Sequence, residues 1–167
     1  MGPQFNVFSK LSKMRMEEVR LYEDGTPEEE RVTSFYSNPH FPAHISGLDS
    51  TIFYRCNGKK LLFGAGTYEE YNEFKNHLAK MVGFNSPEEL WKSGHPVFFV
   101  ELLYFSNCEG TIGPIICKKL FQDFKDNFNL AEEYFAQLNN GNKFWVHYQN
   151  WFKALSIASN NGAILIT

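Results

Sequence analysis

Cysteine is scarce in this chain of 167 residues, and its spacing excludes two common classes of small protein. The three cysteines, Cys56, Cys108 and Cys117, contain no Cys-x-x-Cys pair, which a zinc ribbon or a thioredoxin-like site requires. Their odd number does not fit a framework in which every cysteine is paired. The sequence therefore predicts free thiols, which are typical of a reducing cytoplasm.

Positive charge and long apolar runs are scarce as well. Lys and Arg number 16 against 19 Asp and Glu, so the net charge is −3 and the strongly basic surface of many nucleic-acid-binding proteins is absent. The longest apolar stretch, residues 96–105, contains Glu101 and is shorter than the about 20 residues that cross a bilayer. Residues 1–20 lack the apolar core of a secretory leader. We therefore expect a cytoplasmic protein that binds neither nucleic acid nor membrane.

Aromatic residues, by contrast, are abundant. The chain has 17 Phe, 8 Tyr and 3 Trp, and 43% of its residues are hydrophobic, which is too apolar for a disordered chain. A chain of this length buries roughly 70% of its surface on folding, enough for one core. We predict a single domain over residues 1–167, with a less regular N-terminal part at 1–49 and the core at 50–162.

The strand signals are strongest between residues 51 and 63. Two β-rich segments, 51–56 and 59–63, flank Asn57-Gly58. Asn-Gly favours the two positive φ angles of a type I′ turn, so the pattern predicts a β-hairpin. Segment 31–36 is a further candidate strand, and the apolar run 97–105 has the length of a buried strand.

Helix signals follow the hairpin. Thr67 and Glu70 have the spacing of a capping box, which predicts a helix from Tyr68 that ends before Gly83. Ser86 followed by Pro87 begins a short helix that ends near Lys92. Apolar residues at helical spacing predict one long helix over 114–138 and a final helix that carries aromatic residues from Phe144 onward and ends near 160–162. The fold class is therefore α+β, a helix-rich single domain with a small antiparallel sheet that includes the hairpin.

Two glycine-rich turns precede predicted helices and form the candidate ligand sites. A glycine-rich helix start leaves backbone N–H groups free near a partial positive charge, which suits a phosphate or carboxylate. Neither turn matches a named nucleotide-binding motif, so no cofactor is predicted. The candidate ligand residues are Gly64, Gly66 and Thr67 in the first turn and Asn107, Gly110, Thr111 and Gly113 in the second.

The second turn also carries Cys108 and Glu109, the candidate catalytic pair. A thiol ahead of a helix start can have a lowered pKa, although an adjacent carboxylate opposes this. His40 and His44 are separated by Pro42, which removes the helix that would align them, so no metal site is predicted. The leading hypothesis is a non-catalytic module that binds an anionic small molecule or a protein partner. The alternatives are a small hydrolase or transferase that uses Cys108 and Glu109, and a structural assembly protein.

Three segments of the core form a specific pattern. They read Gly64-Ala-Gly-Thr-Tyr68, Leu78-Ala-Lys80 and Phe99-Val-Glu-Leu-Leu-Tyr-Phe-Ser-Asn-Cys-Glu-Gly-Thr-Ile-Gly-Pro114. With the aromatic C-terminal helix, this pattern resembles an uncharacterised family of bacterial and phage-encoded proteins over residues 61–162. Asn107 stands where the family pattern has aspartate, which argues against chemistry that needs paired carboxylates at 107 and 109. The resemblance implies a bacterial or phage origin and no particular reaction.

Overall fold

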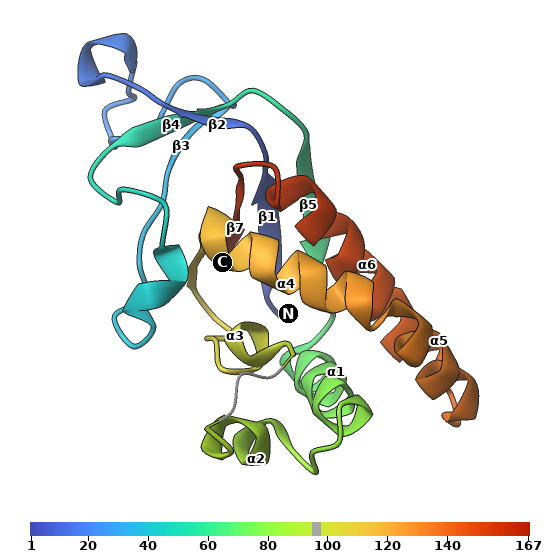
Figure 1. Cartoon of the computed structure of the whole chain (residues 1–167). Coiled ribbons are helices and arrows are strands. Elements are labelled where there is room, and N and C mark those ends of the chain that lie inside the picture. The colour runs from blue at the N-terminus through green and yellow to red at the C-terminus, as the bar shows by residue number, and fades with distance from the viewer. Residues whose placement is uncertain (95–97) are drawn as a thin grey trace.

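The computed structural model describes residues 1–94 and 98–167, and within them it confirms the α+β class. These residues form six α-helices and two small antiparallel sheets, and the sheet of β2 (Leu11–Lys13), β3 (Val32–Ser34) and β4 (Phe53–Cys56) lies at the end of the molecule away from the helices (Figure 1). The helices are α1 (Tyr68–Met81), α2 (Pro87–Lys92), α3 (Val100–Leu103), α4 (Pro114–Asp126), α5 (Phe128–Gln137) and α6 (Asn142–Ala158). Two short 3-10 turns, η1 (Met16–Glu18) and η2 (Pro42–Ile45), lie in the N-terminal part.

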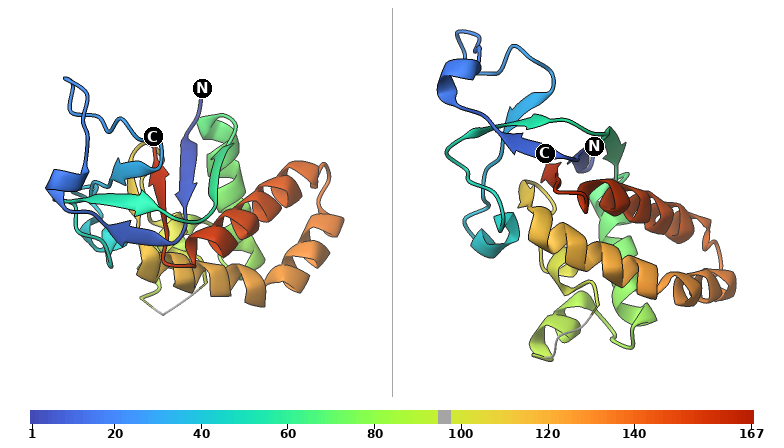
Figure 2. Two further views of the ribbon diagram at one scale, coloured as in Figure 1. Left: turned by 90° about the horizontal axis from the view of Figure 1, so that it is seen from above. Right: turned by 45° about the horizontal axis from the view of Figure 1, so that its top comes forward.

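The first sheet joins the two ends of the chain. Its strand order is β5-β1-β7-β6, with β5 at Lys60–Gly64, β1 at Gln4–Phe8, β7 at Ala163–Ile166 and β6 at Gly110–Ile112. Helix α6 packs against β1, β5 and β7, and α4 lies beside α6 (Figure 2). The termini therefore form the centre of the sheet, although the sequence places the regular core at residues 50–162.

The predicted hairpin at 51–63 is wrong. Strand β4 (Phe53–Cys56) pairs with β2 (Leu11–Lys13), whereas β5 pairs with β1. Segments 4–13 and 54–64 thus form one long antiparallel ribbon that passes from the first sheet to the second. Three residues, 57–59, lie opposite two, 9–10, so Asn57-Gly58 forms a bulge rather than a hairpin turn. The positive φ in this region, +49°, belongs to Lys10 on the partner strand.

The second sheet has the order β2-β4-β3, with β3 at Val32–Ser34 inside the predicted segment 31–36. It covers a separate small core in which Phe8, Leu11, Phe35 and Tyr54 are buried. The N-terminal part, residues 1–49, contains irregular segments, as expected. It also contains the three strands β1, β2 and β3, and it contributes buried residues to both hydrophobic cores.

Helices α1 and α2 begin and end as their capping residues predict. The Thr67 hydroxyl accepts from the Glu70 N–H, and the Glu70 carboxylate accepts from the Thr67 N–H, which completes the capping box. Gly83 follows the end of α1 with φ +97°. The Ser86 hydroxyl accepts from the Glu89 N–H at the start of α2, which ends at Lys92.

The single helix predicted over 114–138 is two helices. The chain breaks at Asn127, a buried residue whose side-chain amide donates to the Asp123 carbonyl at 2.9 Å. The backbone N–H of Asn127 donates to the same carbonyl at 3.1 Å, and with φ −100° and ψ +11° the residue leaves the helical range, so α4 ends here. The last helix forms as predicted.

The strand predicted at 97–105 is also wrong. Residues 98–99 form a turn, 100–103 form α3, and Val97 lies outside the described residues. Phe99 takes a left-handed conformation with φ +66°, and its N–H donates to the buried Asp123 carboxylate at 3.0 Å. The run is apolar because Phe99, Leu102 and Leu103 all enter the core. An apolar run of this length does not by itself distinguish a strand from a short buried helix.

The core contains one polar atom whose removal should stabilise the protein. The hydroxyl of Tyr71 is fully buried and has no hydrogen-bond partner among the described residues. A buried hydroxyl without a partner costs about 1–3 kcal/mol. We expect Tyr71→Phe to raise the free energy of unfolding by about 1 kcal/mol in urea denaturation, because it removes this cost and keeps the ring. A loss of stability would show that the hydroxyl has a partner, such as a buried water.

Candidate functional site

Backbone N–H groups of the first glycine-rich turn, residues 64–67, are bonded to neighbouring parts of the chain. The Thr67 N–H is used by Glu70, and the Ala65 N–H donates to the Pro3 carbonyl at 3.1 Å. A Cβ on Gly2 would meet the Gly66 carbonyl oxygen, so the N-terminal segment packs directly on the turn. Gly64 is the last residue of β5. Of the residues predicted to hold an anion in this turn, Thr67 thus already uses its N–H within the chain.

The second turn is divided between two environments. Residues 110–112 form β6 and are buried, and the Thr111 hydroxyl donates to the Tyr36 carbonyl. The Gly113 N–H donates to the His44 carbonyl at 2.7 Å. Asn107 instead faces α1, where it contacts Asn72 and Lys75. The two turns thus pack against different segments, and anion binding at their residues stays a prediction.

The candidate catalytic pair is exposed. Ser106 accepts from the N–H groups of both Cys108 and Glu109, and the Asn38 amide donates to the Glu109 carbonyl. Cys108 interacts electrostatically with Lys75. The histidine base that a Cys108 nucleophile requires is not among these contacts.

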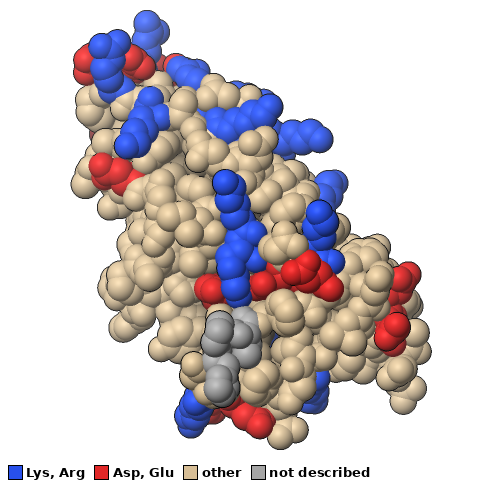
Figure 3. Space-filling view, viewed as in Figure 1, with Lys and Arg blue, Asp and Glu red and all other residues tan. Residues whose placement is uncertain are grey.

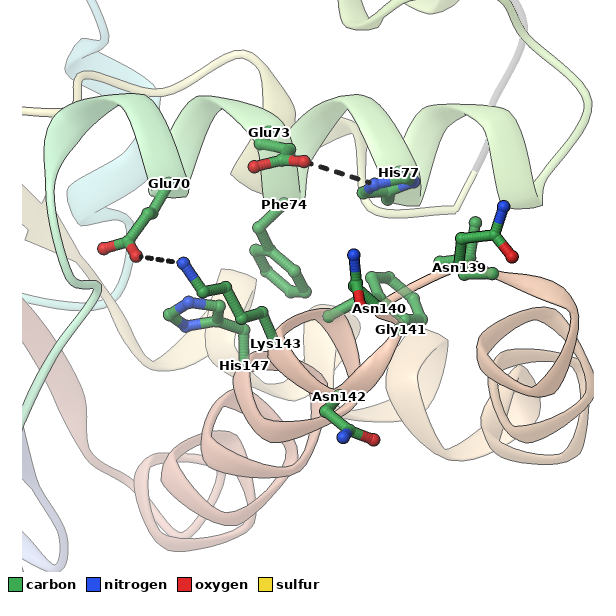
Figure 4. A pocket seen from close by; sticks show the side chains of 12 residues that line it. Glu70, Glu73, Phe74, His77, Asn139, Asn140, Gly141, Asn142, Lys143 and His147 are labelled. Carbon is green, nitrogen blue, oxygen red and sulfur yellow. Dashed lines mark hydrogen bonds and ion pairs between the residues drawn. The ribbon is translucent and has the colours of Figure 1, made fainter.

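A cavity of about 500 Å³ lies between α1 and the turn that joins α5 to α6 (Figure 4). This volume is within the range of small-molecule sites. One wall is the face of α1 that carries Glu70, Glu73, Phe74 and His77, which are spaced three or four residues apart. The opposite wall combines the turn with the start of α6 and consists of Leu138, Asn139, Asn140, Gly141, Asn142, Lys143, Phe144 and His147.

The floor of the cavity is aromatic. The rings of Phe74 and Phe144 lie 5.8 Å apart between their centroids, and both residues are buried. Phe74 also packs on His147 at 5.5 Å, and Phe144 packs on His77 at 5.7 Å. The two imidazoles therefore each rest against a ring of the floor.

The imidazole of His77 is held in place by two polar neighbours. Its Nδ1 lies 2.8 Å from the Tyr134 hydroxyl, and its Nε2 lies 4.0 Å from a Glu73 carboxylate oxygen. Burial lowers the pKa of His77, against the opposing effect of Glu73. At neutral pH the ring is uncharged and can both donate and accept a hydrogen bond.

His147 lies beside an ion pair. Lys143 Nζ lies 2.8 Å from Glu70 Oε1, which joins α6 to α1 at one end of the cavity (Figure 4). Hydrogen bonds from Lys143 and Thr67 lower the pKa of Glu70 to about 2, so this carboxylate stays charged. Burial lowers the pKa of His147, and its ring is also neutral at pH 7.

The turn at 139–142 supplies amide groups. Asn140 has φ +61°, a left-handed conformation that asparagine tolerates, and its side chain extends toward α1, whereas that of Asn142 points away (Figure 4). Among the described residues, no hydrogen-bond partner is found for the side-chain amides of Asn139 and Asn140. Each such amide offers both a donor and an acceptor to a molecule in the cavity.

The charge of the cavity does not favour an anion. Two carboxylates, Glu70 and Glu73, face one ammonium, Lys143, and both imidazoles are neutral. Lys and Arg side chains gather instead over the end of the molecule that holds β2 and β4 (Figure 3). The site is thus suited to an uncharged molecule that has several hydrogen-bonding groups.

Sequence reasoning missed this cavity. The aromatic residues at helical spacing in α1 and α6 indicated core positions, and most of them are buried, although Tyr68 is 42% exposed. Asn139-Asn140-Gly141 indicated only the end of the helix predicted over 114–138. The useful signal was the polar face of α1, on which Glu70, Glu73 and His77 are aligned. Its partner, the 139–147 segment, lies more than 60 positions further along the chain.

Comparison with protein-family models, with curated protein sequences and with solved structures gave no match. In the described part of the chain, no helix is long and apolar enough to cross a membrane. The same residues contain no group of three or more His, Cys, Asp or Glu side chains arranged to hold a metal ion.

We expect stability to fall below pH 6.5 as the two cavity imidazoles are forced to charge. Folding lowers the pKa of both His77 and His147, so the unfolded chain binds more protons once the pH drops below its own histidine pKa. The contribution of these two groups is therefore complete above about pH 6.5 and is lost as the pH falls through their folded pKa values. Urea denaturation from pH 7 to pH 5 measures the fall, and His77→Phe with His147→Phe should reduce it to the part that belongs to other groups, such as the buried His44, whose pKa is also lowered by burial. A fall of equal size in this double variant would assign it to other groups.

Proposed function

We propose that the protein is a non-catalytic binding module for a small uncharged sugar, held in the cavity between α1 and α6. The observation that carries the proposal is the combination of the Phe74 and Phe144 floor with two neutral imidazoles and the amide of Asn140, for which the described residues supply no partner. A pyranose ring has apolar C–H faces that pack on aromatic rings, and its edge consists of hydroxyls that both donate and accept. The cavity offers the matching groups.

The charge balance supports an uncharged ligand over the anion expected from the glycine-rich turns. A phosphate or carboxylate in the cavity would lie near Glu73, which has no ammonium partner within 4.0 Å among the described residues, and near Glu70, which Lys143 already pairs. Repulsion between like charges disfavours such a ligand. The bacterial or phage origin implied by the resemblance stays a prediction.

Calorimetric titration with glucose, galactose and N-acetylglucosamine tests the proposal, with glucose 6-phosphate as the anionic comparison. We expect at least one neutral sugar to bind and the phosphate to bind at least tenfold more weakly than glucose. Absence of binding by all three neutral sugars, or stronger binding of the phosphate, would overturn the proposal.

Two substitutions place the binding in this cavity. Asn140→Gly keeps the left-handed backbone and removes the amide, and His147→Phe keeps the ring against Phe74 and removes its polar atoms. Each should weaken sugar binding about tenfold, the cost of one lost hydrogen bond to a buried group. Asn161→Gly is the matched control, because Asn161 also has positive φ but lies in the turn before β7. If Asn140→Gly and Asn161→Gly weakened sugar binding equally, the sugar would not be bound in this cavity.

A further inference from the structure

A second cavity, of about 420 Å³, lies between α1, α2 and the segment that follows α3. Its wall includes Trp91, Leu103 and the amides of Asn72 and Asn107. It also includes Lys75, which is 5% exposed, so the ammonium-bearing side chain lies almost completely inside the protein. Lysine is rarely buried to this degree unless it is paired with an opposite charge.

Lys75 is held by oxygen atoms that carry no full charge. Its Nζ donates to the Phe105 carbonyl at 3.1 Å and to Asn107 Oδ1 at 2.5 Å. The Asn107 amide donates in turn to Asn72 Oδ1 at 2.7 Å, which fixes the orientation of the acceptor. Within the described residues, no carboxylate oxygen lies within 4.0 Å of Nζ.

This environment favours the neutral amine. Burial lowers the pKa of Lys75 to about 7, and an electrostatic interaction with Cys108 opposes the shift without cancelling it. The Tyr71 ring, whose centroid is 4.7 Å from Nζ, also favours the cation. A neutral amine satisfies both acceptors with its two hydrogens and keeps a lone pair, which is the group that reacts with electrophiles.

We propose that Lys75 is a nucleophile that forms an imine with a small aldehyde or ketone in this cavity. The Nζ lone pair attacks the carbonyl carbon, and the carbonyl oxygen takes the electron pair and then a proton from nitrogen, giving a carbinolamine. Loss of the hydroxyl with the second nitrogen proton releases water and leaves a C=N bond. No oxidant or reductant takes part. Trp91 and Leu103 would contact the apolar body of the carbonyl compound, and the Asn72 and Asn107 amides its polar substituents.

The test is reductive trapping of the full chain with benzaldehyde and sodium cyanoborohydride at pH 7, followed by peptide mass mapping. We expect Lys75 to be alkylated at least tenfold faster than Lys80, an exposed lysine of the same helix. Because both lysines are measured in the wild-type chain, the comparison does not depend on a variant that folds.

Lys75→Arg keeps a long side chain whose N–H groups can donate to the same oxygens and removes the primary amine, so the fast adduct should disappear while the slow adducts on exposed lysines remain. Modification of Lys75 no faster than that of Lys80 would overturn the proposal, as would a fast adduct that persists in Lys75→Arg. Both outcomes are independent of sugar binding in the first cavity.

Discussion

Trp151→Ala is expected to remove about 4 kcal/mol from the free energy of unfolding, measured by guanidinium denaturation. Trp151 is fully buried where α6 crosses the first sheet, and its ring lies 4.7 Å from that of Phe5 and 5.3 Å from that of Phe63. Truncation of a buried tryptophan removes apolar burial and leaves a cavity, which together cost about 3–5 kcal/mol. Phe5 is on β1, so the loss reports the docking of α6 on the strand at the centre of the sheet.

Trp91→Ala is the matched control. Trp91 lies on α2, is 37% exposed and packs on the ring of Tyr104 at 4.8 Å. Because its substitution opens no enclosed cavity, we expect a loss of about 1 kcal/mol or less. Equal losses in the two variants would show that the helix layer does not depend on the Trp151 contacts.

Gly162→Ala is expected to cost about 3 kcal/mol, at the upper end of the range for forced overpacking. Gly162 lies between α6 and β7, and a Cβ there would be 1.9 Å from the Phe8 carbonyl oxygen and 2.9 Å from that of Ala158. Both atoms belong to the backbone, so neither can move aside as a flexible side chain would. The methyl group can be accommodated only if the end of β1 separates from the end of α6.

Gly83→Ala provides the comparison for this prediction. Gly83 has φ +97° and open space around the position of a Cβ. Its substitution strains the backbone alone and should cost about 1 kcal/mol. Thermal and urea denaturation of both variants measure the difference, and a Gly162→Ala protein as stable as Gly83→Ala would contradict the close approach of β1 to α6.

The features that the sequence predicted correctly are those that depend on neighbouring residues. Thr67 and Glu70 are three positions apart, and Ser86 caps a helix that begins at the next residue. The hairpin failed because Asn57-Gly58 has the composition of a turn, while the strand that pairs with 60–64 is 4–8, more than 50 residues away. The turn preference of Asn-Gly depends on adjacent residues and therefore gives no information about a strand more than 50 residues away.

The candidate site was not predicted for the same reason, since it too depends on contacts between distant segments. The glycine-rich turns were identified from composition, but their N–H groups depend on tertiary contacts such as Gly113 with His44. The cavity depends on the alignment of α1 with the 139–147 segment, and the burial of Lys75 depends on the fold of 105–107. The sequence supplies these side chains without indicating which of them meet.

The central claim is that the cavity between α1 and α6 binds a neutral sugar. The most direct measurement is an NMR titration of ¹⁵N-labelled protein with the neutral sugar that binds most tightly in calorimetry. The chemical shifts of the backbone amides and of the imidazole rings are recorded at each sugar concentration. We predict saturable chemical-shift changes concentrated at Phe74, His77, Asn140 and His147, with little change at residues 107–113. Saturable shifts centred on 64–67 or 107–113 instead, or no saturable shift with any of the three sugars, would contradict it.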